Sequence, residues 1–123
     1  MPAMPGLQGR TAIITGATSG MGHATAILFA REGADIVASG RDQARGRAIM
    51  DEIRAAGGRV EFVPGDVSLP EVNERLVETS VRVFGGVDTI VCFAGMLGLG
   101  SLTGVPVGSY EARQRYPPCR WAR

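Results

Sequence analysis

The feature that most constrains the fold is a glycine-rich segment, residues 15–22, with the spacing T-G-x-x-x-G-x-G. It lies between a short apolar run and an apolar-rich stretch with helical spacing. Gly16 would allow a tight turn, Gly20 would let the backbone approach a pyrophosphate, and Gly22 would permit close packing of the helix on the strand. No Gly-Lys-Ser/Thr follows, which excludes a P-loop. The segment predicts a strand–turn–helix unit whose helix N-terminus faces phosphates, although a purely structural turn is the alternative.

The same rhythm of strand and helix continues to residue 95. Short β-branched or alternating apolar runs predict strands, and apolar residues at helical spacing predict helices between them. Such an alternation predicts a parallel sheet covered by helices on both faces, with right-handed crossovers. The expected fold class is α/β, a partial Rossmann-type doubly wound parallel sheet with strand order 3-2-1-4. The expected strands are 11–15, 35–39, 60–64 and 88–93, and the expected helices are 23–32, 42–56 and about 69–84.

Helix ends and inward faces follow from local chemistry. Asp42 is a plausible N-cap, residues 68–71 (SLPE) are typical of a capping box with an early proline, and Gly33 is a natural helix stop. Cys92 lies in an apolar run and is expected to be a small buried residue. The helical residues expected to face inward are Ala26, Ile27, Ala30, Ala48, Ile49, Ile53, Val72, Leu76, Val83 and Phe84.

Composition excludes several function classes. The net charge of +1 gives no electrostatic reason to expect nucleic acid or an anionic membrane as a partner. The longest apolar runs are strand-sized, and residues 1–9 carry no charged segment of a signal peptide, so we expect a cytoplasmic protein. A single histidine, His23, excludes a His-based metal cluster, and the two widely separated cysteines form neither a metal-binding spacing nor a disulfide framework.

Four further residues complete a family pattern. Asp66 and Val67 follow the third expected strand, and Ala94 and Gly95 follow the fourth. Together with the glycine spacing, these residues make approximately residues 7–95 resemble the short-chain dehydrogenase/reductase family. The resemblance implies an NAD(P)-binding half-domain over residues 1–95, followed by an irregular tail, 96–123, that is rich in glycine and then in arginine and proline. The expected cofactor-binding residues are Gly16, Thr18, Ser19, Gly20, Met21, Gly22, Arg41, Asp66, Val67, Ala94 and Gly95.

The choice between NAD and NADP depends on the end of the second strand. A carboxylate there would hydrogen-bond the ribose 2′-hydroxyl of NAD, whereas an arginine suits the 2′-phosphate of NADP. The chain has Gly40 and Arg41 at this point, followed by Asp42. Arg41 can pair bidentately with a phosphate, so NADP is favoured and NAD is the alternative. The alternative without cofactor binding is that the Arg41 side chain is solvated and Asp42 serves only as a helix N-cap.

The residues that the resemblance implies for hydride-transfer chemistry are missing. The family uses a serine and a Tyr-x-x-x-Lys motif, in which the lysine helps a tyrosine of pKa about 10 to work near neutral pH. All 13 basic residues are arginines, so no lysine is present. Gln114 lies four residues after Tyr110, and a Pro-Pro pair breaks the helix after Tyr116. We therefore expect no catalytic residue here, and Cys92-Phe93 also replaces the family's two asparagines.

Three interpretations of function remain open. The chain is an oxidoreductase acting on a carbonyl or alcohol if intact, but is truncated and inactive as it stands. Alternatively, it is a non-enzymatic dimerisation or regulatory module that binds an intact homologue. A third interpretation is a frameshift after about residue 110. Because strand 88–93 would form an exposed apolar edge, we also expect self-association, aggregation or coverage of that edge by residues 96–123.

Overall fold

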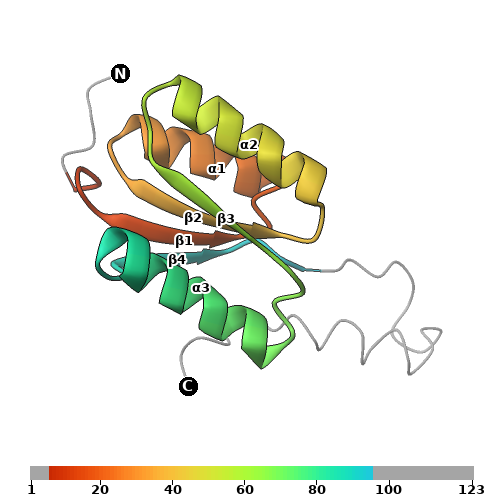
Figure 1. The fold of residues 1–123 in the computed structure, drawn as a ribbon. Helices are drawn as coiled ribbons and strands as arrows, with labels where there is room; N and C mark the ends of the chain where they lie inside the picture. Colours follow the sequence, from red (N-terminus) through yellow and green to blue (C-terminus); the bar gives the residue numbers. More distant parts are fainter. Residues whose placement is uncertain (1–5, 96–123) are drawn as a thin grey trace, which may run out of the picture.

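The computed structural model describes residues 6–95, which form one parallel sheet with helices on both faces (Figure 1). The sheet has four strands in the order β3-β2-β1-β4, and all neighbouring strands are parallel. The expected fold class and strand order are therefore confirmed. The elements are β1 (Thr11–Thr15), α1 (Gly20–Arg31), β2 (Asp35–Gly40), α2 (Gln43–Ala55), β3 (Val60–Pro64), α3 (Pro70–Phe84) and β4 (Thr89–Cys92).

The sheet separates two apolar cores because successive side chains of a strand point to opposite faces. Ala12 and Ile14 of β1 belong to the core beneath α1 and α2, whereas Ile13 belongs to the core beneath α3. All five residues of β1 are buried, as expected for a strand covered on both faces. Figure 1 shows α1 and α2 on one side of the sheet and α3 on the other.

Two helix starts differ from the sequence prediction. Helix α1 begins at Gly20 instead of residue 23, so the last part of the glycine segment is already helical. Helix α3 has Leu69 as its N-cap and makes no side-chain capping bond, so the capping box expected over residues 68–71 is wrong. The Asp66 carboxylate orders this loop instead, because it accepts a hydrogen bond of 2.9 Å from the Ser68 N–H. The expected cap at Asp42 is confirmed, since its side chain accepts from the Arg45 N–H at 3.1 Å.

Two expected interior positions are also wrong. Ala48 and Val83 are exposed, and two positions that were not expected to face inward, Gly46 and Ser80, are buried on the same helices. Gly46 is buried because the ring of Phe62 from β3 lies where a Cβ would be. Ser80 lies one helical turn beyond Leu76 and donates a hydrogen bond of 2.6 Å to the Gly86 carbonyl.

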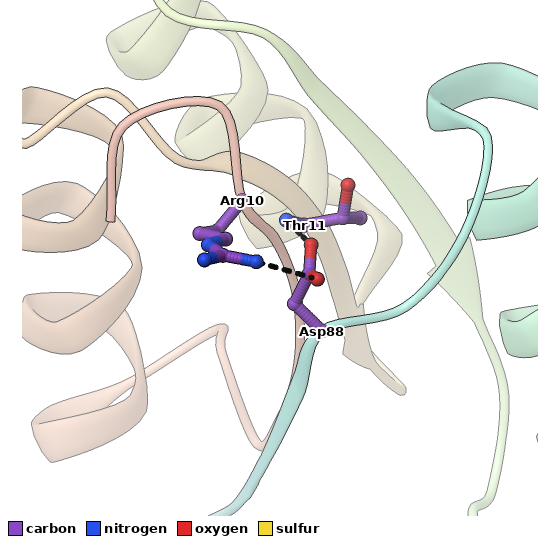
Figure 2. A network of polar contacts seen from close by, with 3 residues as sticks. All are labelled: Arg10, Thr11 and Asp88. Carbon is purple, nitrogen blue, oxygen red and sulfur yellow. Dashed lines mark hydrogen bonds and ion pairs between the residues drawn. The ribbon is translucent and has the colours of Figure 1, made fainter. Parts of the chain in front are cut away.

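Strand β4 is fixed at its start to the start of β1 (Figure 2). The Asp88 carboxylate accepts from the buried Thr11 N–H at 2.8 Å and lies 3.4 Å from the Arg10 guanidinium. The Asp88 N–H in turn donates to the Thr11 carbonyl at 2.9 Å. These bonds fix the register of β4 on β1. Cys92, at the far end of β4, is exposed because β4 lies at the sheet edge, so the expectation that it is buried is wrong.

Residues 6–95 hold neither a membrane span nor a metal-binding cluster. No helix in this range is both long and apolar enough to cross a membrane. The same residues contain no group of three or more His, Cys, Asp or Glu side chains placed to hold a metal ion.

Candidate functional site

A cavity of about 230 Å³ lies at the carboxyl ends of the strands. In an open α/β sheet this is where ligands bind, beside the point at which the chain reverses its direction of winding. That point here lies between β1 and β4, because β2 and β3 were added on one side of β1 and β4 is added on the other. The cavity is lined by the turn after β1, the ends of β2 and β4, and the loop after β3. Its lining residues are Gly16, Thr18, Ser19, Met21, Gly22, Ser39, Gly40, Arg41, Gly65, Asp66, Val67, Phe93, Ala94 and Gly95.

Every residue expected at the site except Gly20 lines this cavity. Gly20 lies between Ser19 and Met21 in the same turn, with a φ of 56° and open space around its Cα. The structure also adds lining residues that the sequence prediction missed. Their position at the carboxyl end of a strand or directly after it was the available signal, because these ends meet at one edge of a parallel sheet. These additional residues are Ser39, Gly40, Gly65 and Phe93.

Two glycines of the segment are required by close backbone packing. Gly16 has a φ of 65°, and a Cβ there would lie 2.7 Å from the Ala94 nitrogen and from the Phe93 carbonyl carbon. A Cβ on Gly22 would overlap the carbonyl oxygen of Gly16. The glycines thus let the turn, the start of α1 and the end of β4 pack backbone to backbone around the cavity.

The first turn of α1 leaves backbone donors at the cavity. The N–H groups at the start of an α-helix have no partner within the helix. Here the N-cap Ser19 makes no side-chain capping bond, and the first turn contains no acidic residue. The aligned peptide dipoles make this end of the helix partly positive, so the arrangement is suited to an anion such as a phosphate.

The loop after β3 forms another part of the cavity wall. Besides the bond from Ser68, the Asp66 backbone carbonyl accepts a hydrogen bond of 3.0 Å from the Leu69 N–H. A Cβ on Gly65 would lie 2.7 Å from a methyl group of Val72, so this loop packs directly on α3. Asp66 and Val67 are therefore held at the cavity by local hydrogen bonds and by packing against α3.

Arg41, directly after the end of β2, places a positively charged guanidinium group at the cavity. Arg41 is exposed and forms no hydrogen bond or ion pair with any residue in the described range 6–95. The neighbouring Asp42 carboxylate is occupied by Arg45, through the capping bond and an ion pair of 3.6 Å. The guanidinium of Arg41 is thus available to an anionic group at the cavity mouth. Ser39 beside it is fully buried, and its hydroxyl has no hydrogen-bond partner among the described residues.

The end of β4 is held by Thr15. The Phe93 N–H donates to the Thr15 carbonyl at 3.2 Å, and the Ala94 N–H donates to the Thr15 hydroxyl at 3.4 Å. The Phe93 ring is half-buried, packs against the core beneath α1 and α2 and also lines the cavity. Thr15 on β1 thus ties the end of β4 to its neighbour, and Cys92 and Phe93 stand at that end where the resemblance would place two asparagines.

Comparison with known proteins identifies the family. The model of a family described as short chain dehydrogenase matches residues 10–112. The chain belongs to the short-chain dehydrogenase family. The match agrees with the parallel sheet and with the placement of the glycine segment at the carboxyl end of β1.

Curated members of the short-chain dehydrogenase family share substantial sequence with this chain. A glucose 1-dehydrogenase of Gluconobacter oxydans is 38% identical over 88 residues, which are 71% of this chain and 33% of that enzyme. An A-factor type gamma-butyrolactone 1′-reductase of Streptomyces virginiae is 46% identical over 82 residues, 67% of this chain and 32% of that enzyme. The chain therefore spans about one third of the length of these two relatives.

Solved short-chain dehydrogenase structures superpose closely. L-sorbose reductase from Gluconobacter frateurii, solved with NADPH and L-sorbose, gives a TM-score of 0.83 at 33% identity, over 89% of this chain and 42% of that one. A short-chain type dehydrogenase/reductase from Mycobacterium marinum gives the same TM-score at 28% identity, over 89% and 44%. The expectations for Tyr110, Tyr116 and the tail 96–123 lie outside the described residues.

Proposed function

We propose that this chain binds NADP(H) in the cavity at the carboxyl ends of its strands. The observation that carries the proposal is the convergence there of the glycine turn, the uncapped start of α1 and the available Arg41. Backbone donors and an available guanidinium together suit a ligand that carries both a pyrophosphate and a phosphate monoester.

Each part of the dinucleotide has a corresponding wall of the cavity. The turn and the first N–H groups of α1 would hold the pyrophosphate, and Arg41 would pair with the 2′-phosphate. Asp66 and Val67 would contact the adenine, while Ala94 and Gly95 would lie toward the nicotinamide. The glycines support this fit, since a Cβ at Gly16 or Gly22 would meet backbone and close the cradle. When bound, the nicotinamide would supply or accept a hydride.

NADP is the preferred cofactor in this proposal. Gly40 ends β2 without a carboxylate, and the carboxylate of Asp42 caps α2 instead of facing a ribose. Recognition of the ribose 2′-hydroxyl of NAD needs a carboxylate acceptor near the end of this strand. Among the relatives, L-sorbose reductase was solved with NADPH.

We propose that these 123 residues alone do not convert a substrate. A family tyrosine would need a lysine close by, and the sequence contains none. An arginine is no substitute, because its guanidinium does not release a proton. Redox chemistry on a carbonyl or alcohol would belong to a form of the protein that also holds the serine and Tyr-x-x-x-Lys. We also propose a cytoplasmic location, as the sequence led us to expect.

Titration of the 123-residue chain with NADPH and, separately, with NADH tests this proposal. We expect NADPH to bind more tightly than NADH by about tenfold, the effect of roughly 1.4 kcal/mol from one charge-assisted pair. Calorimetry measures both dissociation constants, and absorbance at 340 nm checks that neither cofactor is oxidised. Binding of neither nucleotide, or tighter binding of NADH, would contradict the proposal.

A second candidate function is association through β4, and the two sheet edges favour it. At the β3 edge, guanidinium groups donate to outward carbonyls: Arg54 to Val60 at 3.2 Å and Arg75 to Pro64 at 3.4 Å. Pro64 also lacks an N–H, so this edge is protected against pairing with another strand. Within residues 6–95, no side chain donates a hydrogen bond to the carbonyls of Thr89–Val91 in β4.

This second candidate predicts self-association that depends on β4. Asp88 bonds to β1 through its N–H, so the alternation of a parallel strand turns the backbone of Val91 outward. Val91→Pro would remove an outward N–H and should convert an associated chain into a monomer. Light scattering after size exclusion, over a range of concentrations, measures the mass. A monomer at every concentration in the unmodified chain would contradict this candidate.

A further inference from the structure

We propose that Thr18 determines which dinucleotide the site accepts, because its side chain fills the space that a carboxylate at the end of β2 would need. This inference rests on the proposed function and goes further, since it assigns cofactor selectivity to a residue of the glycine turn after β1. It concerns Thr18, in the glycine turn, and Gly40, the last residue of β2.

The two residues touch across the cavity wall. A Cβ placed on Gly40 would overlap the Thr18 methyl group and would lie 2.9 Å from Oγ1 and 3.2 Å from Cβ of Thr18. Both residues line the cavity. Gly40 does not adopt the left-handed conformation that favours glycine. The Thr18 side chain, and not the backbone conformation, therefore disfavours a side chain at this position.

Thr18 has little freedom to move away. The residue before it, Ala17, is fully buried, and its N–H donates to the Ser39 carbonyl at 3.0 Å. This hydrogen bond joins the residue before Thr18 to the residue before Gly40, so it holds the turn against the end of β2. The three staggered rotamers about χ1 move the methyl and hydroxyl groups of Thr18 but leave its Cβ in place, 3.2 Å from a Cβ added at Gly40. The position of the Thr18 Cβ beside Gly40 is consequently a fixed part of the cavity.

This contact has a direct consequence for recognition of the adenosine ribose. A carboxylate that reads the 2′-hydroxyl of NAD would begin at the Cβ of residue 40. Thr18 fills that space, so an acidic side chain there would have to displace the Thr18 side chain or the turn. The polar groups left at the strand end are the Thr18 hydroxyl and the Arg41 guanidinium, which both suit a phosphate monoester. Selectivity for the phosphorylated ribose is therefore set jointly by Thr18 and Arg41.

A double-mutant cycle on the 123-residue chain tests the inference. Gly40→Asp alone should lower Tm and gain no affinity for NADH, because the new Cβ meets Thr18. Thr18→Gly combined with Gly40→Asp should recover Tm and favour NADH over NADPH by about tenfold, as one newly formed carboxylate–hydroxyl pair allows. Isothermal titration calorimetry gives the dissociation constants, and differential scanning calorimetry gives Tm for each variant.

Matched variants separate crowding from charge. Gly40→Ala introduces the Cβ without a carboxylate, so its loss of Tm should also be recovered by Thr18→Gly. Ser19→Gly is the control. Ser19 lines the same cavity, but the three atoms nearest to a Cβ added at Gly40 all belong to Thr18. Combined with Gly40→Asp, it should recover neither Tm nor NADH binding.

The outcomes distinguish the role of Thr18 from the function on which it rests. If the unmodified chain binds neither nucleotide, the proposed function fails and the role of Thr18 fails with it. If the unmodified chain prefers NADPH but Gly40→Asp alone binds NADH as tightly as the double variant, only the role of Thr18 is overturned. That role is likewise overturned if the double variant still prefers NADPH.

Discussion

Replacing Gly22 with alanine is expected to lower the free energy of unfolding by about 3 kcal/mol, the upper range for forcing atoms into a packed site. The new methyl group would overlap the Gly16 carbonyl oxygen and lie 3.2 Å from the Ala17 Cα. All of these neighbours are backbone atoms, so no side-chain rotation can relieve the contact. Because Gly22 lies in the first turn of α1 and lines the cavity, the same change should abolish nucleotide binding. Urea denaturation followed by circular dichroism measures the loss of stability.

Two other glycines provide the comparison for this experiment. An alanine at Gly86 would meet nothing within 4 Å and should change stability by no more than about 0.5 kcal/mol. An alanine at Gly20 would also enter open space, but with a φ of 56° it should cost about 1 kcal/mol. The expected order of destabilisation is Gly22, then Gly20, then Gly86. Equal stability of the Gly22 and Gly86 variants would show that the turn is not packed as described.

Replacing Arg41 with alanine is expected to weaken NADPH binding by about tenfold to a hundredfold, as the loss of hydrogen bonds between charged groups predicts. NADH binding should change little, because NADH lacks the phosphate that Arg41 would contact. Arg41 lines the cavity and has no partner among residues 6–95 that would compete for its guanidinium. The loss should therefore appear in binding and not in the folding of the chain.

Arg47→Ala controls for the loss of one positive charge. Arg47 is also exposed, lies on α2 and does not line the cavity. Its replacement should leave both dissociation constants unchanged, and the ratio for the two cofactors should change only in the Arg41 variant. An equal loss of NADH and NADPH affinity in the Arg41 variant would refute its assignment to the 2′-phosphate.

The strands and the glycine turn could be predicted because their causes lie close together in the sequence. Residues 11–15 are apolar and β-branched on both faces, and β1 has those same bounds. Gly16 and Gly22 follow from the need for backbone contact in one short turn. The same local chemistry placed the N-cap at Asp42. The strand order also followed, since alternating strands and helices allow few arrangements.

The errors occurred where a residue's surroundings come from a distant part of the chain. Gly46 is buried in place of Ala48 because the ring of Phe62, on the next strand, occupies that side of α2. Cys92 is apolar in its sequence context but lies on an edge strand, where the sheet leaves it exposed.

The contact between Thr18 and Gly40 could not be predicted from the sequence for the same reason. Thr18 and Gly40 each stood in a recognisable motif, but their contact depends on the turn folding over the end of β2. Ser39 and Gly65 were missed for a similar reason, because a lining role depends on which loops converge. Local patterns predicted most of the residues that line the cavity, and only the three-dimensional packing gave its detailed shape.

The central claim is that one nucleotide is held jointly by the turn after β1, the end of β2 and the loop after β3. Titration of the ¹⁵N-labelled 123-residue chain with NADPH, followed by amide chemical shifts, tests this most directly. We predict saturable shifts at Gly22, Arg41 and Asp66 together, with none at the exposed face of α3. Shifts confined to another surface, or no shifts at all, would contradict the claim.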